Sequence, residues 1–333
     1  MRILVTGGGG FLGGEIVHQL LARGEGVRSF GRSPQPALAA RGVEVCEGNL
    51  ADADAVARAI AGCDAVIHTA AKAGIWGSWP DYFQPNVLGT QNVLAAIRLH
   101  GVPRLVYTST PSVVFNGESH AGVDESQPYG QNFPCHYPHT KALAEQMVLA
   151  AHNDKGLRVV ALRPHLIWGR GDPHLVPRIL SRASTLRIVG NGDNRVDLTH
   201  VRHAAQAHLL ALDALALPGH PAGGRAYFIS DGAPVNLWDW INTLLRSLGR
   251  PPVTRRISLH NARIVGAIME VVWRALPFLP GEPPMTRFLA SELAKDHWYS
   301  IAAARRDLNF QPAANLANEM AELLISLKHS PLG

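Results

Sequence analysis

The chain has 333 residues, of which 47% are hydrophobic and 17% are charged, and its formal net charge is +5. This length allows one large domain with a smaller second lobe, and the hydrophobic content excludes a disordered chain. Lysines and arginines are scattered, so the sequence lacks the basic run that is typical of nucleic-acid binding. The positive charge fits a basic cleft that attracts anionic molecules.

Short apolar runs alternate with segments of helical periodicity through the first half of the chain. Strands are predicted over residues 2–6, 27–30, 43–47, 65–68, 104–108 and 158–162. Helices are predicted over residues 11–23, 53–60, 86–99 and 137–151. This alternation is typical of βαβ units, so we expect an α/β fold with a doubly wound parallel sheet.

The pattern loosens after residue 165, where glycine, proline and histidine become frequent. One more strand is predicted at 226–230 and one helix at 237–248. We therefore expect a first domain over 1–165 and a smaller substrate lobe over 166–333, with about 196–232 returning to the first domain. No internal repeat is visible.

Residues 263–279 are strongly apolar, but Glu270 and Arg274 interrupt the run. The segment is too short and too charged to span a bilayer. A helix of the second lobe is the first interpretation, and a helix that faces lipid or lies on a membrane surface is the second.

A glycine run follows the first predicted strand and precedes the first predicted helix. Gly7, Gly10 and Gly13 have the spacing TGxxGxxG, and Gly8, Gly10 and Gly13 have the spacing GxGxxG. Glycine lets the backbone approach a pyrophosphate, and the helix N-terminus stabilises the phosphate charge. The run therefore predicts a dinucleotide site.

Tyr137 and Lys141 are four residues apart, on one face of a predicted helix, and a hydroxyl-rich run at 107–112 precedes them. Reduction of a carbonyl builds an alkoxide, which needs a proton donor. Free tyrosine has a pKa near 10, and an adjacent ammonium and the charge of an oxidised nicotinamide lower that pKa. The pattern predicts a nicotinamide-dependent reductase or dehydrogenase that acts on a carbonyl or a secondary alcohol.

The end of the second predicted strand indicates which nicotinamide cofactor is used. NAD-preferring enzymes place an acidic residue there, but this chain has Gly31, followed by Arg32 and Ser33. A guanidinium can grip a phosphate through two parallel hydrogen bonds, which favours NADP(H). The alternative is a solvated Arg32 and an enzyme that accepts both cofactors.

Together these motifs resemble the extended short-chain dehydrogenases/reductases, in the branch with 3β-hydroxysteroid dehydrogenases and nucleotide-sugar epimerases. The matching segments are TGGGGFLG at 6–13, NVLGT at 86–90, YTST at 107–110, YPHTK at 137–141 and LRPHLIWGRGD at 162–172. Local matches at 71–78, 108–113, 171–175 and 298–301 resemble the 2-alkyl-3-oxoalkanoate reductases of bacterial long-chain olefin biosynthesis. The resemblance implies a Rossmann domain with a C-terminal substrate lobe.

The resemblance also assigns roles to residues. Tyr137 is the expected acid/base, and Lys141 is expected to bind the nicotinamide ribose and tune Tyr137. Thr110 takes the place of the catalytic serine, with Ser109 and Ser112 as alternatives. No metal site is expected. The residues expected to hold NADP(H) are Gly7, Gly10, Phe11, Leu12, Gly13, Arg32, Ser33, Asn49, Leu50, Ala70, Ala71, Lys72, Tyr137, Lys141, Pro164 and Ile167.

The implied reaction is NADPH-dependent reduction of the 3-keto group of a long-chain 2-alkyl-3-oxoalkanoate. A 3β-hydroxysteroid-type dehydrogenase is the alternative enzyme, and a non-catalytic NADP(H) sensor or scaffold is the alternative outside enzymes. Aromatic residues at 76–83 are expected to line an apolar cavity for a lipid acid. Lys72 or Arg170 is expected to bind its carboxylate, and His165 to face substrate.

The sequence also predicts the partners of the protein and its location in the cell. The helices at 86–99 and 137–151 carry apolar residues on more than one face, and related reductases pair these helices, so we expect a homodimer. Assembly with other enzymes of the pathway and a peripheral membrane contact are further expectations. Cys46, Cys63 and Cys135 form no disulfide or metal pattern, which favours the reducing cytoplasm. The first predicted strand, at residues 2–5, is expected to leave no room for a signal peptide.

Overall fold

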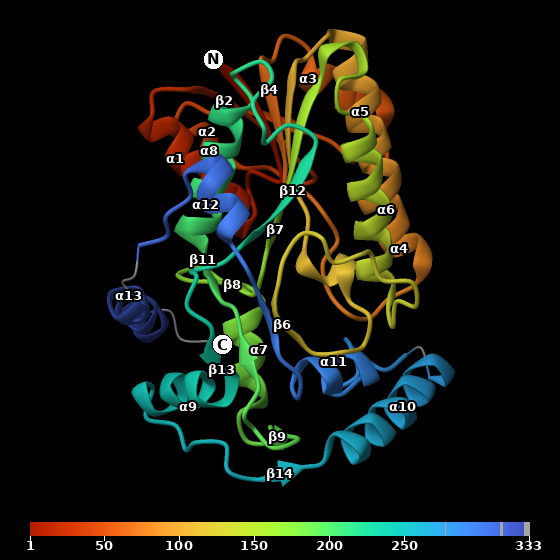
Figure 1. The fold of residues 1–333 in the computed structure, drawn as a ribbon, viewed down its shortest axis with the longest axis vertical. Coiled ribbons are helices and arrows are strands. Elements are labelled where there is room, and N and C mark those ends of the chain that lie inside the picture. Colours follow the sequence, from red (N-terminus) through yellow and green to blue (C-terminus); the bar gives the residue numbers. More distant parts are fainter. Residues whose placement is uncertain (277, 314–315, 330–333) are drawn as a thin grey trace.

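The computed structural model describes residues 1–276, 278–313 and 316–329. A seven-stranded sheet fills the upper half of the molecule, with the order β12-β7-β5-β4-β1-β2-β3 (Figure 1). All of its strand pairs are parallel. The strands are β1 (Arg2–Thr6), β2 (Gly26–Gly31), β3 (Glu44–Glu47), β4 (Ala65–His68), β5 (Arg104–Thr108), β7 (Arg158–Pro164) and β12 (Arg225–Ile229). The predicted α/β fold with a doubly wound parallel sheet is confirmed.

Helices cover both faces of this sheet. One face carries α1 (Phe11–Ala22), α8 (Val201–Ala214) and α12 (Ala302–Leu308), and the other carries α3 (Ala53–Ile60), α5 (Gly89–His100) and α6 (His136–Ala150) (Figure 1). Side chains alternate between the two cores, because Ile3 and Val5 of β1 pack on the first face and Leu4 packs on the second. Strands buried on both faces are mostly apolar, as β1 and β4 are, and such short apolar runs can be recognised in the sequence.

Most predicted elements of the sheet lie where the sequence places them. The helix expected at 86–99 differs, because it begins as a π-helical turn over Gln84–Leu88 and continues as α5. Asn86 in this turn is buried, and its side chain bonds the backbone of Lys72 through both its oxygen and its nitrogen. A π-helical turn is often found where one side chain is held for function.

The lower half of the molecule is a second layer with its own core. Its helices are α7 (Leu175–Arg182), α9 (Leu237–Ser247), α10 (Leu259–Ala275) and α11 (Arg287–Glu292). A small sheet has the order β13-β10-β15-β6, with β13 at Val235–Asn236, β10 at Arg195–Val196, β15 at His297–Tyr299 and β6 at His120–Val123. Because β6 comes from the first half of the chain, the lower lobe is not purely C-terminal. The proposed domain boundaries stay a prediction.

The remaining α-helices and strands belong to one or other of the two layers. They are α2 (Pro36–Ala39), α4 (Trp79–Phe83), the strand pairs β8 (Ile167–Trp168) with β11 (Thr199–His200) and β9 (Ile188–Val189) with β14 (Arg256–Ile257), and the helix α13 (Leu316–His329). Within the described part of the chain, none of the helices combines the length and hydropathy needed to cross a membrane.

Candidate active site

The predicted cofactor residues gather along one edge of the main sheet. The glycine run follows β1, Arg32 and Ser33 follow β2, Asn49 and Leu50 follow β3, residues 70–72 follow β4, and Pro164 ends β7. Parallel strands present their carboxyl ends at the same edge. The chain leaves β1 for β2 on one side, and β4 lies on the other side, so the glycine run lies at the point where strand order reverses. Open α/β sheets bind ligands at such a point.

The glycine run forms a cradle that a side chain would fill. A Cβ atom on Gly13 would lie 2.0 Å from the carbonyl oxygen of Gly7, and Gly7 itself has a φ of 74°. Helix α1 begins after Gly10, and its first turn contains no acidic residue. The N–H groups of this turn are therefore free of a competing carboxylate and suit an anionic phosphate. This local geometry fits the pyrophosphate of a dinucleotide.

The end of β2 lies beside this cradle. The Gln35 side chain lies against the end of β2, where its oxygen accepts a hydrogen bond of 2.5 Å from the Ser29 hydroxyl. A Cβ atom on Gly31 would lie 2.6 Å from the Gln35 amide nitrogen, so the Gln35 side chain fills the space that a side chain at residue 31 would take. Arg32 and Ser33 are exposed and have no carboxylate in an ion pair with them among the described residues. The corner therefore offers a guanidinium and a hydroxyl to a ligand.

Tyr137 lies in the first turn of α6, opposite the end of β5. A hydrogen bond from the Thr110 side chain reaches its hydroxyl, and Thr110 also bonds the Ser112 hydroxyl at 2.9 Å. Burial raises the pKa of Tyr137 to about 12, although the bond to Thr110 works in the opposite direction. Tyr137 is therefore protonated at neutral pH. The Ser109 hydroxyl is buried, with no hydrogen-bond partner among the described residues.

Lys141 lies one helical turn after Tyr137 and is buried. Its ammonium donates to the Tyr107 hydroxyl and to the Thr108 carbonyl, both at 2.6 Å. Burial lowers the pKa of Lys141 to about 7, against the opposing charge of Glu145. The sequence predicted that Lys141 keeps Tyr137 acidic, but in the protein alone the pKa of Tyr137 is raised. The physical reason is that the loss of water around Tyr137 dominates, while Lys141 is bonded to Tyr107 and Thr108.

A cavity of about 600 Å³ is lined by Cys135 and His136, the two residues before Tyr137, but not by Tyr137 itself. Tyr82 also lines it, and the rings of Tyr82 and Tyr137 are 6.5 Å apart. Other lining residues are Ile75, Trp76, Trp273 and Arg274. Of the aromatic residues expected here, Trp76 and Tyr82 are on the wall, whereas Trp79 and Phe83 pack against each other.

The structure does not bring the two expected carboxylate-binding residues to this cavity wall. Lys72 and Arg170 are exposed and are not lining residues. Arg274 of α10 is a lining residue, and its guanidinium lies 5.6 Å from the ring centre of Trp76. Sequence reasoning used Arg274 only as an interruption of an apolar run. Arg274 and Trp76 are almost two hundred residues apart, so no local pattern in the sequence indicates their contact.

His165 was expected to face substrate, but it is buried and bonded within the protein. Its Nε2 lies 2.6 Å from Nδ1 of His297, and its backbone N–H donates to the Thr199 hydroxyl. Burial lowers the pKa of His165 well below the usual value, so the ring is neutral. The pair ties the end of β7 to β15, which is a structural role.

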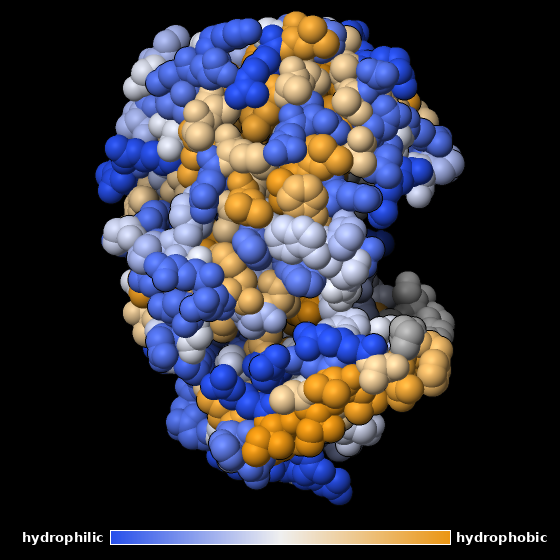
Figure 2. Space-filling model, turned by 90° about the vertical axis from the view of Figure 1, so that its right-hand side faces the viewer, coloured by the Kyte–Doolittle hydropathy of each residue, from blue (hydrophilic) through white to orange (hydrophobic). Residues whose placement is uncertain are grey.

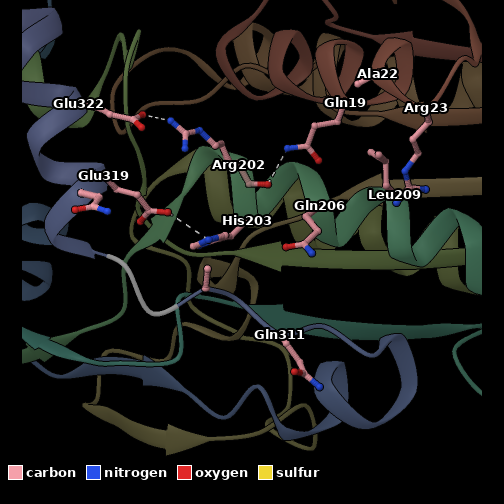
Figure 3. Close-up of a pocket in the computed structure, with 12 residues that line it drawn as sticks. Gln19, Ala22, Arg23, Arg202, His203, Gln206, Leu209, Gln311, Glu319 and Glu322 are labelled. Atoms are coloured by element: carbon pink, nitrogen blue, oxygen red, sulfur yellow. Dashed lines mark hydrogen bonds and ion pairs between the residues drawn. The ribbon is translucent and has the colours of Figure 1, made fainter.

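A second cavity, of about 680 Å³, lies between α1, α8 and α13 (Figure 3). At its wall, His203 Nδ1 lies 2.8 Å from Asp231 and Nε2 lies 3.3 Å from Glu319. Burial lowers the pKa of His203, but the bond to Asp231 and the two negative charges outweigh it and raise the pKa. Although these three could be grouped around a metal ion, each ring nitrogen faces a different carboxylate, which suits a protonated imidazole.

None of the residues lining the second cavity was predicted to be catalytic or cofactor-binding. His203 lies in the first turn of α8. By holding Asp231 and Glu319 it fastens α13 to α8 (Figure 3). The expected absence of a metal remains a prediction.

Buried neutral histidines predict acid sensitivity. Burial lowers the pKa of His68 to about 3 and of His200 and His208 to about 4. The unfolded chain binds their protons below about pH 6.5, so stability is fully present above that pH and falls as pH drops towards the folded values. Burial raises the pKa of Asp197 to about 7, so the folded chain gains a proton there as pH drops. This gain offsets the loss of stability from one of the three histidines. We expect the free energy of unfolding to fall by about 2–4 kcal/mol from pH 7 to pH 5.

Urea denaturation at the two pH values measures this loss. His18 is exposed, so His18→Asn is the matched control and should leave the difference between the two pH values unchanged. His208→Asn should reduce it by about 1–2 kcal/mol, because one proton-binding step is removed from the unfolded chain. A stability equal at pH 7 and pH 5 would contradict the prediction.

The model of the 3-beta hydroxysteroid dehydrogenase/isomerase family matches residues 4–260 of this chain. That match covers well over half of the sequence. The chain belongs to this family. Its motifs are those of the extended short-chain dehydrogenases/reductases, as the sequence predicted, and it is an oxidoreductase.

Two relatives extend the comparison over nearly the whole chain. A 2-alkyl-3-oxoalkanoate reductase of Stenotrophomonas maltophilia is 51% identical, over 98% of this chain and 99% of the relative. A 3 beta-hydroxysteroid dehydrogenase/Delta 5→4-isomerase of Mycobacterium tuberculosis is 38% identical, over 97% of this chain and 89% of the relative. Among solved structures, a dTDP-glucose 4,6-dehydratase from Streptomyces venezuelae superposes with a TM-score of 0.78 at 23% identity, over 99% of this chain and 98% of that one. This last likeness supports the fold.

Proposed function

We propose that this protein reduces the 3-keto group of a long-chain 2-alkyl-3-oxoalkanoate to the 2-alkyl-3-hydroxyalkanoate, in hydrocarbon (olefin) biosynthesis. One observation carries the proposal. A protonated tyrosine, hydrogen-bonded by Thr110, lies near an aromatic cavity of about 600 Å³ that has Arg274 on its wall. The similarity to the Stenotrophomonas reductase supports the same substrate class.

The side chains of this chain divide the work of proton transfer. Tyr137 donates its proton to the substrate oxygen as negative charge develops there, and Thr110 donates a hydrogen bond that favours the resulting phenolate. The buried Lys141 ammonium adds positive charge next to β5. The Asn86 side chain accepts a hydrogen bond from the Lys72 backbone N–H and donates one to the Thr140 hydroxyl at 3.0 Å. These bonds hold the first turns of α6 in place.

Substrate binding follows from the cavity wall. Trp76, Tyr82 and Trp273 provide apolar surface for alkyl chains, and burial of such surface contributes about 25 cal/mol per Å². Arg274 is the proposed partner of the substrate carboxylate, since a guanidinium can bind it through two hydrogen bonds. Lys72 and Arg170 are less well placed for this role.

We propose NADP(H) as the cofactor, held by the glycine cradle and by the residues at the strand ends. When bound, the nicotinamide supplies the hydride. Gly31, which carries no carboxylate, and the exposed Arg32 and Ser33 beside it support a 2′-phosphate on the adenosine ribose. Asn49 stays the proposed adenine neighbour, although its side chain caps its own turn by accepting from Ala51 N–H at 3.0 Å.

Replacing Arg32 with alanine should separate the two cofactors. A charge-assisted phosphate contact contributes about 1.5–3 kcal/mol, so kcat/KM with NADPH should fall about 10- to 100-fold while the value with NADH stays nearly unchanged. Arg41, another exposed arginine of the same domain, provides the control through Arg41→Ala. Equal losses of kcat/KM with both cofactors would show that Arg32 does not bind the 2′-phosphate.

A turnover assay tests the function itself. Purified protein with NADPH should convert a synthetic long-chain 2-alkyl-3-oxo acid to the hydroxy acid, identified by mass spectrometry. Rates on a 3-ketosteroid and on a short uncharged ketone should be far lower. A higher rate on the steroid would favour the hydroxysteroid alternative, and no turnover of any substrate would favour the sensor or scaffold.

A homodimer remains a proposal. Four of the apolar residues that suggested it, Val93, Leu94, Ala142 and Val148, are buried within this chain and need no partner. Leu143 and Met147 of α6 remain half-buried and are available to a second copy. Light scattering at micromolar concentration would measure the oligomeric state. The three cysteines are free, which supports the proposed cytoplasmic location, and assembly with other enzymes of the pathway is also proposed.

A further inference from the structure

Helix α10 presents an apolar face to the outside of the molecule. Ile264, Ile268 and Val271 are exposed, and their spacing of four and three residues places them on one side of the helix. Leu276 and Phe278, which follow the helix, are exposed as well. Figure 2 shows this surface as a continuous hydrophobic band along the lower edge of the molecule. An exposed band of this kind marks an interaction surface.

The opposite face of α10 is locked against the protein. A Cβ atom on Gly266 would lie 2.6 Å from the backbone of Thr286, so the two backbones are in close contact. Glu270 is buried and accepts hydrogen bonds from the backbone N–H and the guanidinium of Arg287, at 2.7–3.0 Å. The helix therefore cannot turn its apolar face inward without separating the buried Glu270 carboxylate from Arg287.

The segment that leads into α10 and contains it carries charge of almost one sign. Residues 241–280 contain six arginines and one glutamate, a net charge of +5 that equals the net charge of the whole chain. The glutamate is Glu270, which is buried and paired, and all six arginines are exposed. Arg255, Arg256 and Arg263 lie in or just before the first turns of α10, whereas Arg246 and Arg250 lie at or just after the end of α9 and Arg274 lines the cavity.

We propose that α10 lies flat on the surface of an anionic phospholipid bilayer, with its apolar face among the acyl chains and Arg255, Arg256 and Arg263 at the headgroups. This is the charge pattern of an interfacial amphipathic helix. A second copy of this chain fits less well, because a two-fold contact through α10 would bring the same arginines against each other.

The same helix forms part of the cavity near Tyr137. Glu270, Trp273 and Arg274 of α10 line the space of about 600 Å³ that also contains Tyr82 and His136. A bilayer on the outer face of α10 would place a lipid acid next to the entrance of that cavity. The inference rests on the proposed function for the identity of this lipid, whereas the membrane contact itself does not depend on it.

Vesicle flotation tests the contact with the full-length protein. The protein should float with vesicles of phosphatidylcholine containing about one third phosphatidylglycerol, and bind pure phosphatidylcholine at least about 10-fold more weakly. Binding to the anionic vesicles should weaken as salt is raised. The Arg255→Gln/Arg263→Gln variant should bind them about 10- to 30-fold more weakly.

Matched apolar substitutions locate the contact on α10. Ile268 and Val271 are 59% and 63% exposed, and Leu99 and Leu217, elsewhere on the surface, are 71% and 61% exposed. The Ile268→Ser/Val271→Ser variant should lose about 10-fold or more in vesicle affinity, whereas Leu99→Ser/Leu217→Ser should bind like the wild type. Circular dichroism checks that both variants are folded.

Three results would overturn the proposal: no flotation with anionic vesicles, equal binding by the two serine variants, or a wild-type dimer that the α10 variant alone abolishes. Turnover without vesicles distinguishes this failure from that of the proposed function. A protein that reduces the 3-oxo acid but does not float would refute the membrane contact only. One that floats but reduces nothing would refute the proposed function only.

Discussion

Replacing Tyr137 with phenylalanine should lower kcat by about 10²-fold or more and leave cofactor affinity nearly unchanged. The substitution keeps the ring that packs 6.5 Å from Tyr82 and removes only the hydroxyl that Thr110 holds. The proton donor is lost, while the glycine cradle, which lies at the end of β1, is untouched. Stopped-flow or steady-state turnover gives kcat, and quenching of protein fluorescence gives the cofactor Kd.

Tyr82→Phe is the matched control. Tyr82→Phe also removes one hydroxyl. In the wild type this hydroxyl donates to the Trp76 carbonyl at 2.9 Å and does not contact Thr110. The kcat of Tyr82→Phe should fall far less than that of Tyr137→Phe. A near-wild-type rate in Tyr137→Phe would refute the proton-transfer role, and a loss of cofactor binding would indicate structural damage instead.

Gly13→Ala should weaken cofactor binding about 10- to 100-fold. The new Cβ would lie 2.0 Å from the Gly7 carbonyl, so the turn must move, and overpacking of this kind costs about 1–3 kcal/mol. The displaced N–H groups would then no longer converge on a phosphate. Isothermal titration with NADPH measures the change in Kd.

The neighbouring glycine offers a close comparison. A Cβ atom on Gly14 would lie 3.5 Å from the Gly8 carbonyl, which is ordinary van der Waals contact. Gly14→Ala should therefore bind NADPH like the wild type, and alanine should favour the helix. Similar affinities for Gly13→Ala and Gly14→Ala would show that the cradle does not hold the cofactor.

The main sheet and the placement of Tyr137 and Lys141 on one helix could be predicted because their signals are local. The strands at 65–68 and 104–108 are runs of buried side chains, and the observed bounds equal the predicted ones. The position of Tyr137 one turn before Lys141 follows from helical spacing. Glycine spacing likewise predicted the cradle, since it reflects the shape of one turn.

What the sequence could not predict depends on contacts between distant residues. Lys141 bonds Tyr107 and Thr108 of β5, and nothing in the spacing of Tyr137 and Lys141 reveals this. Arg274 reaches the cavity only because α10 packs there. The strands of the lower sheet are two to four residues long, too short for a periodic pattern.

The pairing of β15 with β6 affects the order in which the protein folds. His297 pairs with His120, and Asp296 bonds Ser119 across 177 residues of sequence. A ribosome that releases the chain from its N-terminus would have made the whole upper sheet before β15 emerges. Until then β6 would have an unpaired edge, and the lower lobe could not close. Loss of the last forty residues should therefore leave the lower lobe open, and it would also uncover the face of the main sheet on which α12 packs.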